Sequence, residues 1–258
     1  MEEISNVPEP RIHTAAMLAI GDELLSGRTK DRNIAHLAQV LTLSGIDLRE
    51  VRIVGDETDD IVAALNALRT RYDFVFTSGG IGPTHDDITA DAVGLAFGLE
   101  VTVHPEAERR LGDYYASRDL PFTDARRRMT RMPAGSSLID NSISVAPGFR
   151  IDNVFVMAGV PSIFSAMLDE VVPTLPAGAL MKSVAIPCPL GEGDIGGPLS
   201  EIQKRHPETA IGSYPKFDGN RYSTELVVRS RNEAALESAR AEVVAMIDRL
   251  AQANASKG

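Results

Sequence analysis

The chain has 258 residues, of which 43% are hydrophobic and 24% charged, as expected of a soluble globular protein with one large domain or a medium and a small one. Its 36 Asp and Glu residues outnumber 26 Lys and Arg residues, so the net charge of -10 argues against a general polyanion-binding surface and favours small molecules or metal ions as partners. Cys188 is the only cysteine, which excludes an intramolecular disulfide and a cysteine-based zinc site.

The N-terminal segment MEEISNVPEPR is acidic and contains proline. It has no positively charged stretch followed by an apolar run, so we expect no secretory signal. No window approaches the roughly 18 uninterrupted apolar residues that a membrane span needs. We therefore expect a cytoplasmic protein that binds neither membranes nor nucleic acid.

The first hundred residues alternate between short apolar runs and amphipathic stripes. The apolar runs predict buried strands at residues 15–20, 48–54 and 73–77. Helical spacing of apolar residues predicts two helices, whose stripes are Ile34, Leu37, Ala38 and Leu41, and Ile61, Ala64, Leu65 and Leu68. Gly45 is placed to end the first, and a further helix is predicted at 88–97. This alternation indicates an α/β fold of three layers, with a mostly parallel sheet between helices.

The middle of the chain is less regular. Residues 105–131 are polar and predict helix, broken at Pro121. Residues 144–150 and 154–157 predict two strands joined by a turn, and residues 161–172 predict a closing helix. The sequence VPTLPAG at 172–178 has two prolines and a glycine, which is typical of an inter-domain linker.

Beyond the linker, the pattern predicts a small β-α-β-β-α module. Strands are expected at 182–186, 210–214 and 221–229, with Thr224, Leu226 and Val228 on one face of the last. A helix is expected at 195–205, and a long C-terminal helix carries the stripe Leu236, Ala239, Val243, Ile247 and Leu250. The expected domains are residues 12–174 and 179–253.

Polar, glycine-containing segments follow three of the predicted strands, at residues 21–27, 55–58 and 78–89. Open α/β sheets bind ligands outside the carboxyl ends of their strands. In the third segment, SGGIGPTHDDIT, the N–H groups of Gly79, Gly80 and Gly82 can form an anion-binding nest. Asp86 and Asp87 precede the next helix, where one can cap it while the other faces a ligand. The alternative is a simple turn with capping aspartates, but the segment is longer than the roughly 2–6 residues of such a connection.

The missing motifs exclude a P-loop site and argue against a dinucleotide site and a serine hydrolase. The chain has no G-x-x-x-x-G-K-[ST] motif of a P-loop nucleotidase. The first strand is followed by GDELLSG in place of the G-x-G-x-x-G of a nicotinamide dinucleotide site. The G-x-S-x-G elbow of serine hydrolases is also missing.

The run TSGGIGPTHDDIT at 77–89 closely resembles the signature loop of the molybdopterin-binding, MoaB/MogA-like fold. The wider sequence resembles the N-terminal part of the competence/damage-inducible CinA proteins. The supporting motifs, in chain order, are AIGDELLSGRTKDRN, VGDE, APGF, MAGVPSIFSAML and IGSYPKF. The resemblance implies a molybdopterin-binding-like α/β domain followed by a small α/β module. The further amidohydrolase domain of long CinA proteins does not follow, so we expect no deamidation of nicotinamide mononucleotide.

Two functions follow from this resemblance. CinA-type domains of this branch are linked to metal-dependent hydrolysis of ADP-ribose to AMP and ribose 5-phosphate. The alternative is a non-catalytic or regulatory binder of molybdopterin or a nucleotide, linked to molybdenum cofactor biosynthesis, since MogA-like relatives adenylylate molybdopterin. Both chemistries need N–H donors for phosphate, and carboxylates that hold a divalent cation or orient water.

Asp56 and Asp87 match the two functional aspartates of the family by position, so the resemblance implies that they are metal ligands or the general base. The expected cofactor is Mg²⁺, Mn²⁺ or Co²⁺, with K⁺ as a further candidate. Relatives are oligomeric, so a homodimer or another homo-oligomer is expected. The other expected ligand contacts are Asp22, Glu23, Asn33, Ser78, Gly79, Gly80, Gly82, Pro83, Thr84, Asp86, Thr89, Gly159 and Pro161.

Several of these residues have alternative interpretations. Asp22 and Glu23 either contact metal or ribose, or cap the turn after the first strand. Asn33 is either a ligand donor or, slightly favoured, an N-cap. His85 is a metal ligand or, more simply, an exposed loop residue.

Three further groups of residues also stay open. The first group is the arginine cluster of Arg126, Arg127, Arg128 and Arg131. This cluster either attracts phosphates, or pairs with acids across a subunit interface, or forms a solvated helix face, which is the favoured interpretation. Tyr214 and Lys216 either reach over the ligand or lie at a domain interface.

Overall fold

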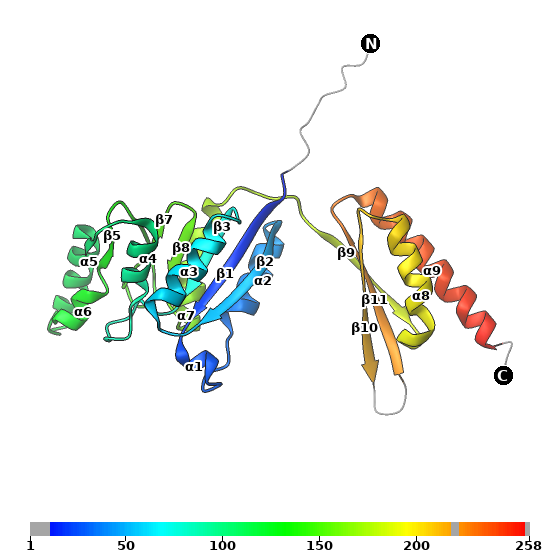
Figure 1. The fold of residues 1–258 in the computed structure, drawn as a ribbon, viewed down its shortest axis with the longest axis horizontal. Helices are drawn as coiled ribbons and strands as arrows, with labels where there is room; N and C mark the ends of the chain where they lie inside the picture. Colours follow the sequence, from blue (N-terminus) through cyan, green and yellow to red (C-terminus); the bar gives the residue numbers. More distant parts are fainter. Residues whose placement is uncertain (1–10, 218–221, 256–258) are drawn as a thin grey trace, which may run out of the picture. The chain divides into compact units, whose positions relative to one another are not determined.

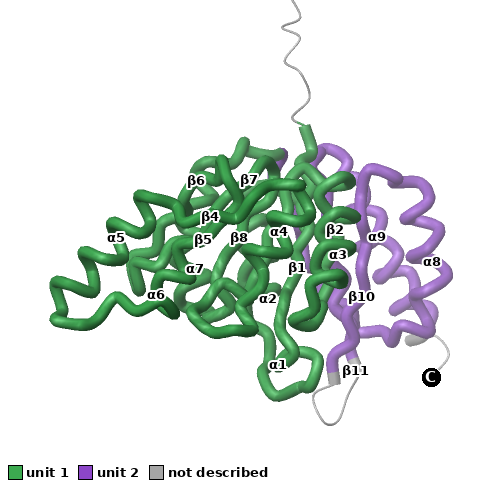
Figure 2. Tube along the Cα trace, turned by 60° about the vertical axis from the view of Figure 1, so that its left-hand side comes forward, with its two compact units in different colours: residues 1–178 green, residues 179–258 purple. Residues whose placement is uncertain are grey.

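The computed structural model describes residues 11–217 and 222–255, and the chain divides into two compact units between residues 178 and 179 (Figure 2). The expected linker at 172–178 ends at this division. No helix among the described residues is both long enough and apolar enough to span a membrane.

The first unit is built on a six-stranded sheet (Figure 1). Its order is β2 (Ile46–Val54), β1 (His13–Ile20), β3 (Phe74–Ser78), β8 (Val154–Met157), β7 (Gly148–Ile151) and β6 (Ser137–Ile139). The first four strands are mutually parallel, whereas β7 is antiparallel to β8 and β6 to β7. The predicted mostly parallel sheet is confirmed, with an antiparallel hairpin at one edge.

Helices cover both faces of this sheet, because successive side chains of a buried strand point to opposite sides. Ala16, Leu18 and Ile20 of β1 pack in a core with α3 (Thr58–Arg69) and α4 (Thr89–Phe97). Ala15 and Met17 point the other way and pack with α2 (Asn33–Leu43) and α7 (Pro161–Val171). The three-layer architecture is therefore confirmed. The short helix α1 (Asp22–Leu25) follows β1 directly, and a 3-10 turn, Val172–Thr174, follows α7.

The structure corrects two predictions in the middle of the chain. Residues 105–131 form two helices on either side of Pro121, as predicted, α5 (Pro105–Ala116) and α6 (Asp124–Arg128), but the helical stretch ends early, and Arg131 begins a strand, β5 (Arg131–Pro133). That strand pairs with β4 (Val101–Val103) in a two-stranded antiparallel sheet. Each strand has only three residues, which is too few to produce a recognisable pattern in the sequence. The strand predicted from residue 144 begins only at Gly148, because the side chain of Asn141 folds residues 141–146 into a turn.

The second unit has the predicted β-α-β-β-α order: β9 (Lys182–Cys188), α8 (Glu192–Arg205), β10 (Ala210–Phe217), β11 (Tyr222–Ser230) and α9 (Glu233–Ala255). Its antiparallel sheet has the order β10-β11-β9. Thr224, Leu226 and Val228 are buried, as predicted for one face of β11, and the two apolar ones join the core of this unit. Arg221, predicted to start this strand, lies outside the described residues.

Candidate functional site

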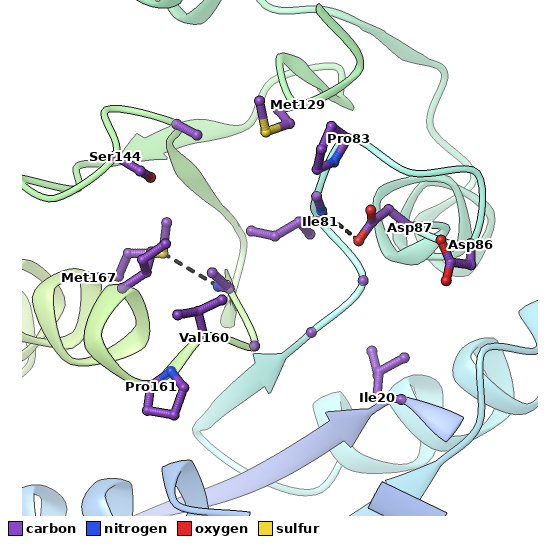
Figure 3. Close-up of a pocket in the computed structure, with 18 of the residues that line it drawn as sticks. Ile20, Ile81, Pro83, Asp86, Asp87, Met129, Ser144, Val160, Pro161 and Met167 are labelled. Atoms are coloured by element: carbon purple, nitrogen blue, oxygen red, sulfur yellow. Dashed lines mark hydrogen bonds between the residues drawn. The ribbon is translucent and has the colours of Figure 1, made fainter. Parts of the chain in front are cut away.

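A cavity of about 740 Å³ lies at the carboxyl ends of the parallel strands of the first unit (Figure 3). The segments that follow β1, β2, β3 and β8 all contribute to its lining. Of the predicted contacts, ten line the cavity: Glu23, Asp56, Gly79, Gly80, Gly82, Pro83, Asp86, Asp87, Gly159 and Pro161. Five others do not line it: Asp22, Asn33, Ser78, Thr84 and Thr89.

The loop after β3 runs directly against the neighbouring backbone. Gly79 has a φ of +111°, and a Cβ atom there would overlap the carbonyl oxygen of Ile20 at the end of β1. Gly80 has a φ of +68°, and a Cβ atom there would overlap the hydroxyl of Thr89. Only glycine satisfies both the backbone conformation and the close approach. The loop therefore holds the cavity edge in a shape that other residues cannot adopt.

The carboxylate of Asp87 stabilises this loop through hydrogen bonds to other loop residues. One carboxylate oxygen accepts a hydrogen bond from Gly82 N at 2.6 Å (Figure 3). The other accepts from Thr84 N at 2.7 Å and from the Thr84 hydroxyl at 2.5 Å. Helix α4 begins at Thr89 without a side-chain cap, so the prediction that Asp86 or Asp87 caps it is wrong. The N–H groups of Gly82 and Thr84 already donate to the Asp87 carboxylate, so this carboxylate does not accept a hydrogen bond from the N–H groups at the start of α4.

Two N–H groups in the glycine-rich part of the loop, residues 79–84, remain available to a ligand. Gly79 N donates to the carbonyl of Met157, while the N–H groups of Gly82 and Thr84 are taken by Asp87. Pro83 has no N–H. Among the described residues nothing accepts a hydrogen bond from Gly80 N or Ile81 N, and both residues line the cavity. Backbone N–H groups presented in this way suit phosphate oxygens.

Carboxylates gather near Asp56, which lines the same cavity. The pKa of Asp56 is raised, first by burial and then by the negative charges of Asp22, Glu23 and Asp86, although the N–H of Asp22 donates to its carboxylate at 3.0 Å. Asp86 is more exposed, and the hydroxyl of Thr84 lowers its pKa. Asp22 and Glu23 form the first turn of α1, where neither caps a helix through its side chain. This concentration of negative charge attracts a cation.

No ready-made metal cage accompanies these carboxylates. Within residues 11–217 and 222–255, no three His, Cys, Asp or Glu side chains are arranged to hold a metal ion. Mg²⁺ is commonly bound by one or two carboxylates together with substrate phosphates and water, and it needs no all-protein cage. Asp56, with its raised pKa and acidic surroundings, fits that kind of partial site. Asp87 fits it less well, because both its oxygens already accept hydrogen bonds.

Asn33 does not line the cavity, but it bonds to two segments beside it. Its side-chain amide donates to the Ser78 hydroxyl at 2.7 Å and to the carbonyl of Gly159 at 2.8 Å, and the residue is only 4% exposed. The favoured interpretation as an N-cap is wrong, since Asp31 accepts the hydrogen bond from Ile34 N. Asn33 instead joins the ends of β3 and β8. Thr89 acts similarly through its hydroxyl, which donates to the carbonyl of Gly79.

The wall opposite the aspartates is apolar, and the sequence did not reveal it. Figure 3 shows Asp86 and Asp87 on one side of the cavity and Val160 and Met167 on the other, with Ile81 between them. Such residues look like core residues in a sequence, and no spacing marks them as ligand contacts. The same is true of Tyr115, Met129 and Ser144, which complete the lining from three other segments.

Val145, in the turn beside this wall, has a φ of +63°, which is unfavourable for a β-branched residue. Asn141 holds the turn by accepting hydrogen bonds from Ile143 N and Ser144 N. We predict that Val145→Asn raises the free energy of unfolding by about 1 kcal/mol, because asparagine tolerates this conformation. Thermal unfolding measures the gain. Val145→Thr keeps the branched side chain and serves as the control; equal stability of the two variants would contradict strain at this position.

The remaining candidates lie elsewhere. The side chain of His85 is fully exposed, which confirms the simpler interpretation of that residue. Tyr214 and Lys216 are in the second unit, where Tyr214 accepts a hydrogen bond from Arg229 and Lys216 pairs with Glu225 at 2.7 Å. Three of the four arginines pair with acids of the first unit, as described below.

Comparisons with known proteins agree with the division into two units. Residues 16–177 match the family described as a probable molybdopterin-binding domain. Residues 181–254 match the family described as the middle domain of FAD synthase. The two matched stretches lie on either side of the division between the units.

Individual relatives point the same way. A CinA-like protein of Desulfosudis oleivorans is 38% identical over 159 residues, which are 60% of this chain and 38% of that protein. The crystal structure of CinA from Thermoplasma acidophilum, a protein of unknown function, aligns with 63% of this chain and 98% of its own at 29% identity and a TM-score of 0.59. The molybdopterin biosynthesis enzyme MoaB of Thermus thermophilus aligns with 64% of this chain and 92% of its own at 20% identity and a TM-score of 0.43. The family match and the CinA-like relative confirm the resemblance found in the motifs.

Proposed function

This chain belongs to the molybdopterin-binding domain family, and from that premise we propose that its cavity binds a nucleotide pyrophosphate such as ADP-ribose and hydrolyses it, with a divalent metal ion, to AMP and ribose 5-phosphate. One observation carries the proposal. The unpartnered N–H groups of Gly80 and Ile81 line the same cavity as Asp56, whose pKa is raised by burial and by neighbouring acids. Residues suited to binding phosphate and a residue suited to activating water thus line the same cavity.

In the proposed reaction, the N–H groups of Gly80 and Ile81 donate to phosphate oxygens, and the apolar wall near Val160 and Met167 contacts a heterocyclic base. Asp56 accepts a proton from water as the water oxygen attacks phosphorus. The bond between that phosphorus and the bridging oxygen breaks, and the bridging oxygen leaves on the other phosphate. The products are two phosphomonoesters, AMP and ribose 5-phosphate.

A divalent cation fits beside Asp56, where it would be held by that carboxylate, substrate phosphate oxygens and water, and it would neutralise charge on the phosphates. Mg²⁺, Mn²⁺ and Co²⁺ are the candidates, with K⁺ as a monovalent addition. Asp87 contributes by keeping the loop in place, and any direct contact with the metal would add to that role.

A second candidate function is binding of molybdopterin or a nucleotide without turnover. The apolar wall beside the unpartnered N–H groups of Gly80 and Ile81 favours it, because these parts alone can hold a heterocyclic ring and a phosphate. Ligand-induced shifts in Tm test this function with a pterin and with nucleotides. A stabilising ligand that is never converted, whatever divalent metal is present, would support it against the hydrolase.

Self-association as a homodimer or higher oligomer stays a prediction, to be checked by light scattering on the purified protein.

Asp56→Asn tests the proposed base. We predict that kcat for ADP-ribose at saturating metal falls about 100-fold or more, because the amide cannot accept the proton of water, and that more metal is needed for the half-maximal rate, because the amide binds a cation less tightly. Since protonated Asp56 cannot accept a proton, the wild-type rate falls at acidic pH as this carboxylate takes up its proton, and the variant loses that acidic limb. Asp59→Asn, which neutralises an exposed aspartate outside the cavity, is the matched control. Unchanged kcat in the Asp56 variant would remove Asp56 from the reaction.

The same variant should not lose stability. Because folding raises the pKa of Asp56, its ionised form opposes folding above that pKa, and this cost disappears as the pH falls below it. The amide side chain introduced by Asp56→Asn retains an oxygen that can accept the hydrogen bond from Asp22 N. We therefore expect Asp56→Asn to have a higher Tm than the wild type at pH 8, with the difference shrinking in acid. A loss of activity with a higher Tm cannot be attributed to unfolding.

A further inference from the structure

A second cleft, of about 430 Å³, adjoins the cavity at Pro83, which lines both. Its other walls include Arg127 and Arg128 of α6 and Arg131 of β5. We call it the arginine cleft. Three guanidinium groups around one cleft are unexpected in a chain with a net charge of -10, and the proposed hydrolysis does not use them.

Much of the hydrogen-bonding capacity of these arginines is unused. Arg131 forms a bidentate pair with Asp91, with distances of 2.7 and 3.3 Å. Arg127 forms one ion pair, through Nε, which lies 3.1 Å from the Glu108 carboxylate. Each guanidinium has five N–H donors in a planar fork, so the terminal donors of Arg127 keep no hydrogen-bond partner among the described residues.

Arg128 is only partly satisfied by the residues around it, since Nη2 donates within the protein whereas Nη1 has no hydrogen-bond partner among the described residues. Its Nε atom is buried and has no hydrogen-bond partner among the described residues, although the side chain lies only 3.8 Å from the Asp91 carboxylate. Buried donors of a charged group are costly when unsatisfied. One terminal nitrogen of Arg128 donates to the backbone carbonyl of Asp87 at 3.1 Å. The arginine cleft is thereby connected to the residue that holds the glycine-rich loop.

We propose that the arginine cleft binds a phosphate group and is a second anion site beside the one formed by Gly80 and Ile81. Guanidinium groups match phosphate oxygens in geometry and charge, and the terminal nitrogens of Arg127 and Nη1 of Arg128 have no hydrogen-bond partner among the described residues. The phosphate is either a free phosphate or a phosphate group of the ligand in the cavity. The inference does not depend on hydrolysis, since it concerns binding alone.

Arginine-specific labelling with phenylglyoxal, read by mass spectrometry on the full chain, tests the proposal. Arg49 is an internal reference, because it is an exposed residue of β2, paired with Asp47 much as Arg127 is paired with Glu108. At phosphate concentrations about four times the Kd, labelling of Arg127 should slow about fivefold, in proportion to the unoccupied fraction, while labelling of Arg49 stays unchanged.

Two probes separate the sources of phosphate. Protection of Arg127 by inorganic phosphate indicates an independent site. Protection by ADP-ribose without metal, but not by inorganic phosphate, indicates that the cleft holds a phosphate of the cavity ligand. Failure of both probes to protect Arg127 relative to Arg49 overturns the proposal. Because neither measurement needs turnover, this result is independent of the hydrolase assay.

A gain of binding gives a second test that does not rely on damaging the fold. Asp124 also lines the cleft, is exposed and forms no ion pair or hydrogen bond with another described side chain. Removing its charge with Asp124→Asn should tighten phosphate binding about two- to fivefold, since it eliminates repulsion at an exposed site. The control is Asp119→Asn, which makes the same change of net charge outside the cleft, at a positive φ that asparagine accepts. Equal affinities in these two variants would contradict an anion site in the cleft.

Discussion

Asp87→Asn is expected to weaken binding of ADP-ribose about 100-fold. The native carboxylate accepts from two backbone N–H groups and one hydroxyl, which together fix the loop that presents Gly80 and Ile81. Asparagine has one acceptor oxygen, and its amide group would face an N–H donor. Losing one or two charge-assisted hydrogen bonds costs about 2–4 kcal/mol, and the loop then no longer holds its N–H groups in place. Titration calorimetry without metal measures this affinity directly.

The neighbouring aspartate provides the control for this prediction. Asp86→Asn removes the same charge from the same loop, but the Asp86 side chain is 61% exposed and does not hold backbone N–H groups of Gly82 or Thr84. Its effect on affinity should be much smaller. If both variants bind equally weakly, charge alone matters, and the role assigned to Asp87 in shaping the loop is incorrect.

Gly79→Ala is expected to produce the largest loss of stability, about 3 kcal/mol or more. The φ of +111° is unfavourable for alanine, and the added methyl group would overlap the backbone oxygen of Ile20, which cannot move without disturbing β1. The loss corresponds to a fall in Tm of roughly 6–12 °C for a chain of this size. Urea unfolding and thermal unfolding both measure it.

Gly27→Ala separates the two causes. Gly27 also has a positive φ, +71°, but a Cβ atom there would have nothing within 4 Å. Its substitution therefore introduces backbone strain without a clash and should cost about 1 kcal/mol. A loss at Gly79 no larger than the loss at Gly27 would show that the close approach to Ile20 does not constrain the loop.

The main layers of the fold could be predicted because strong periodicities mark them. The stripe of Ile61, Ala64, Leu65 and Leu68 is buried as expected, and the apolar run at 15–20 lies in β1, which is paired on both sides by β2 and β3. The three-residue strands β4 and β5 could not be predicted in this way. Segments that short contain too few residues for a periodicity to emerge.

Glycines and aspartates after strand ends were enough to locate the candidate site, since such residues lie where an open α/β sheet binds ligands. The roles of single residues were harder to predict. Local sequence favours a capping role for Asn33, yet its partners are Ser78 and Gly159, which are distant in sequence. Val160 and Met167 look like core residues, and only the tertiary structure places them on the cavity wall.

Release of AMP from ADP-ribose tests the proposed function most directly. The purified chain is incubated with ADP-ribose and Mg²⁺, Mn²⁺ or Co²⁺, with and without K⁺, and the products are separated by chromatography. We predict AMP and ribose 5-phosphate in equal amounts, dependent on a divalent metal and abolished by Asp56→Asn. Binding of ADP-ribose with no AMP under any metal would contradict the hydrolase and leave the cavity as a binding site.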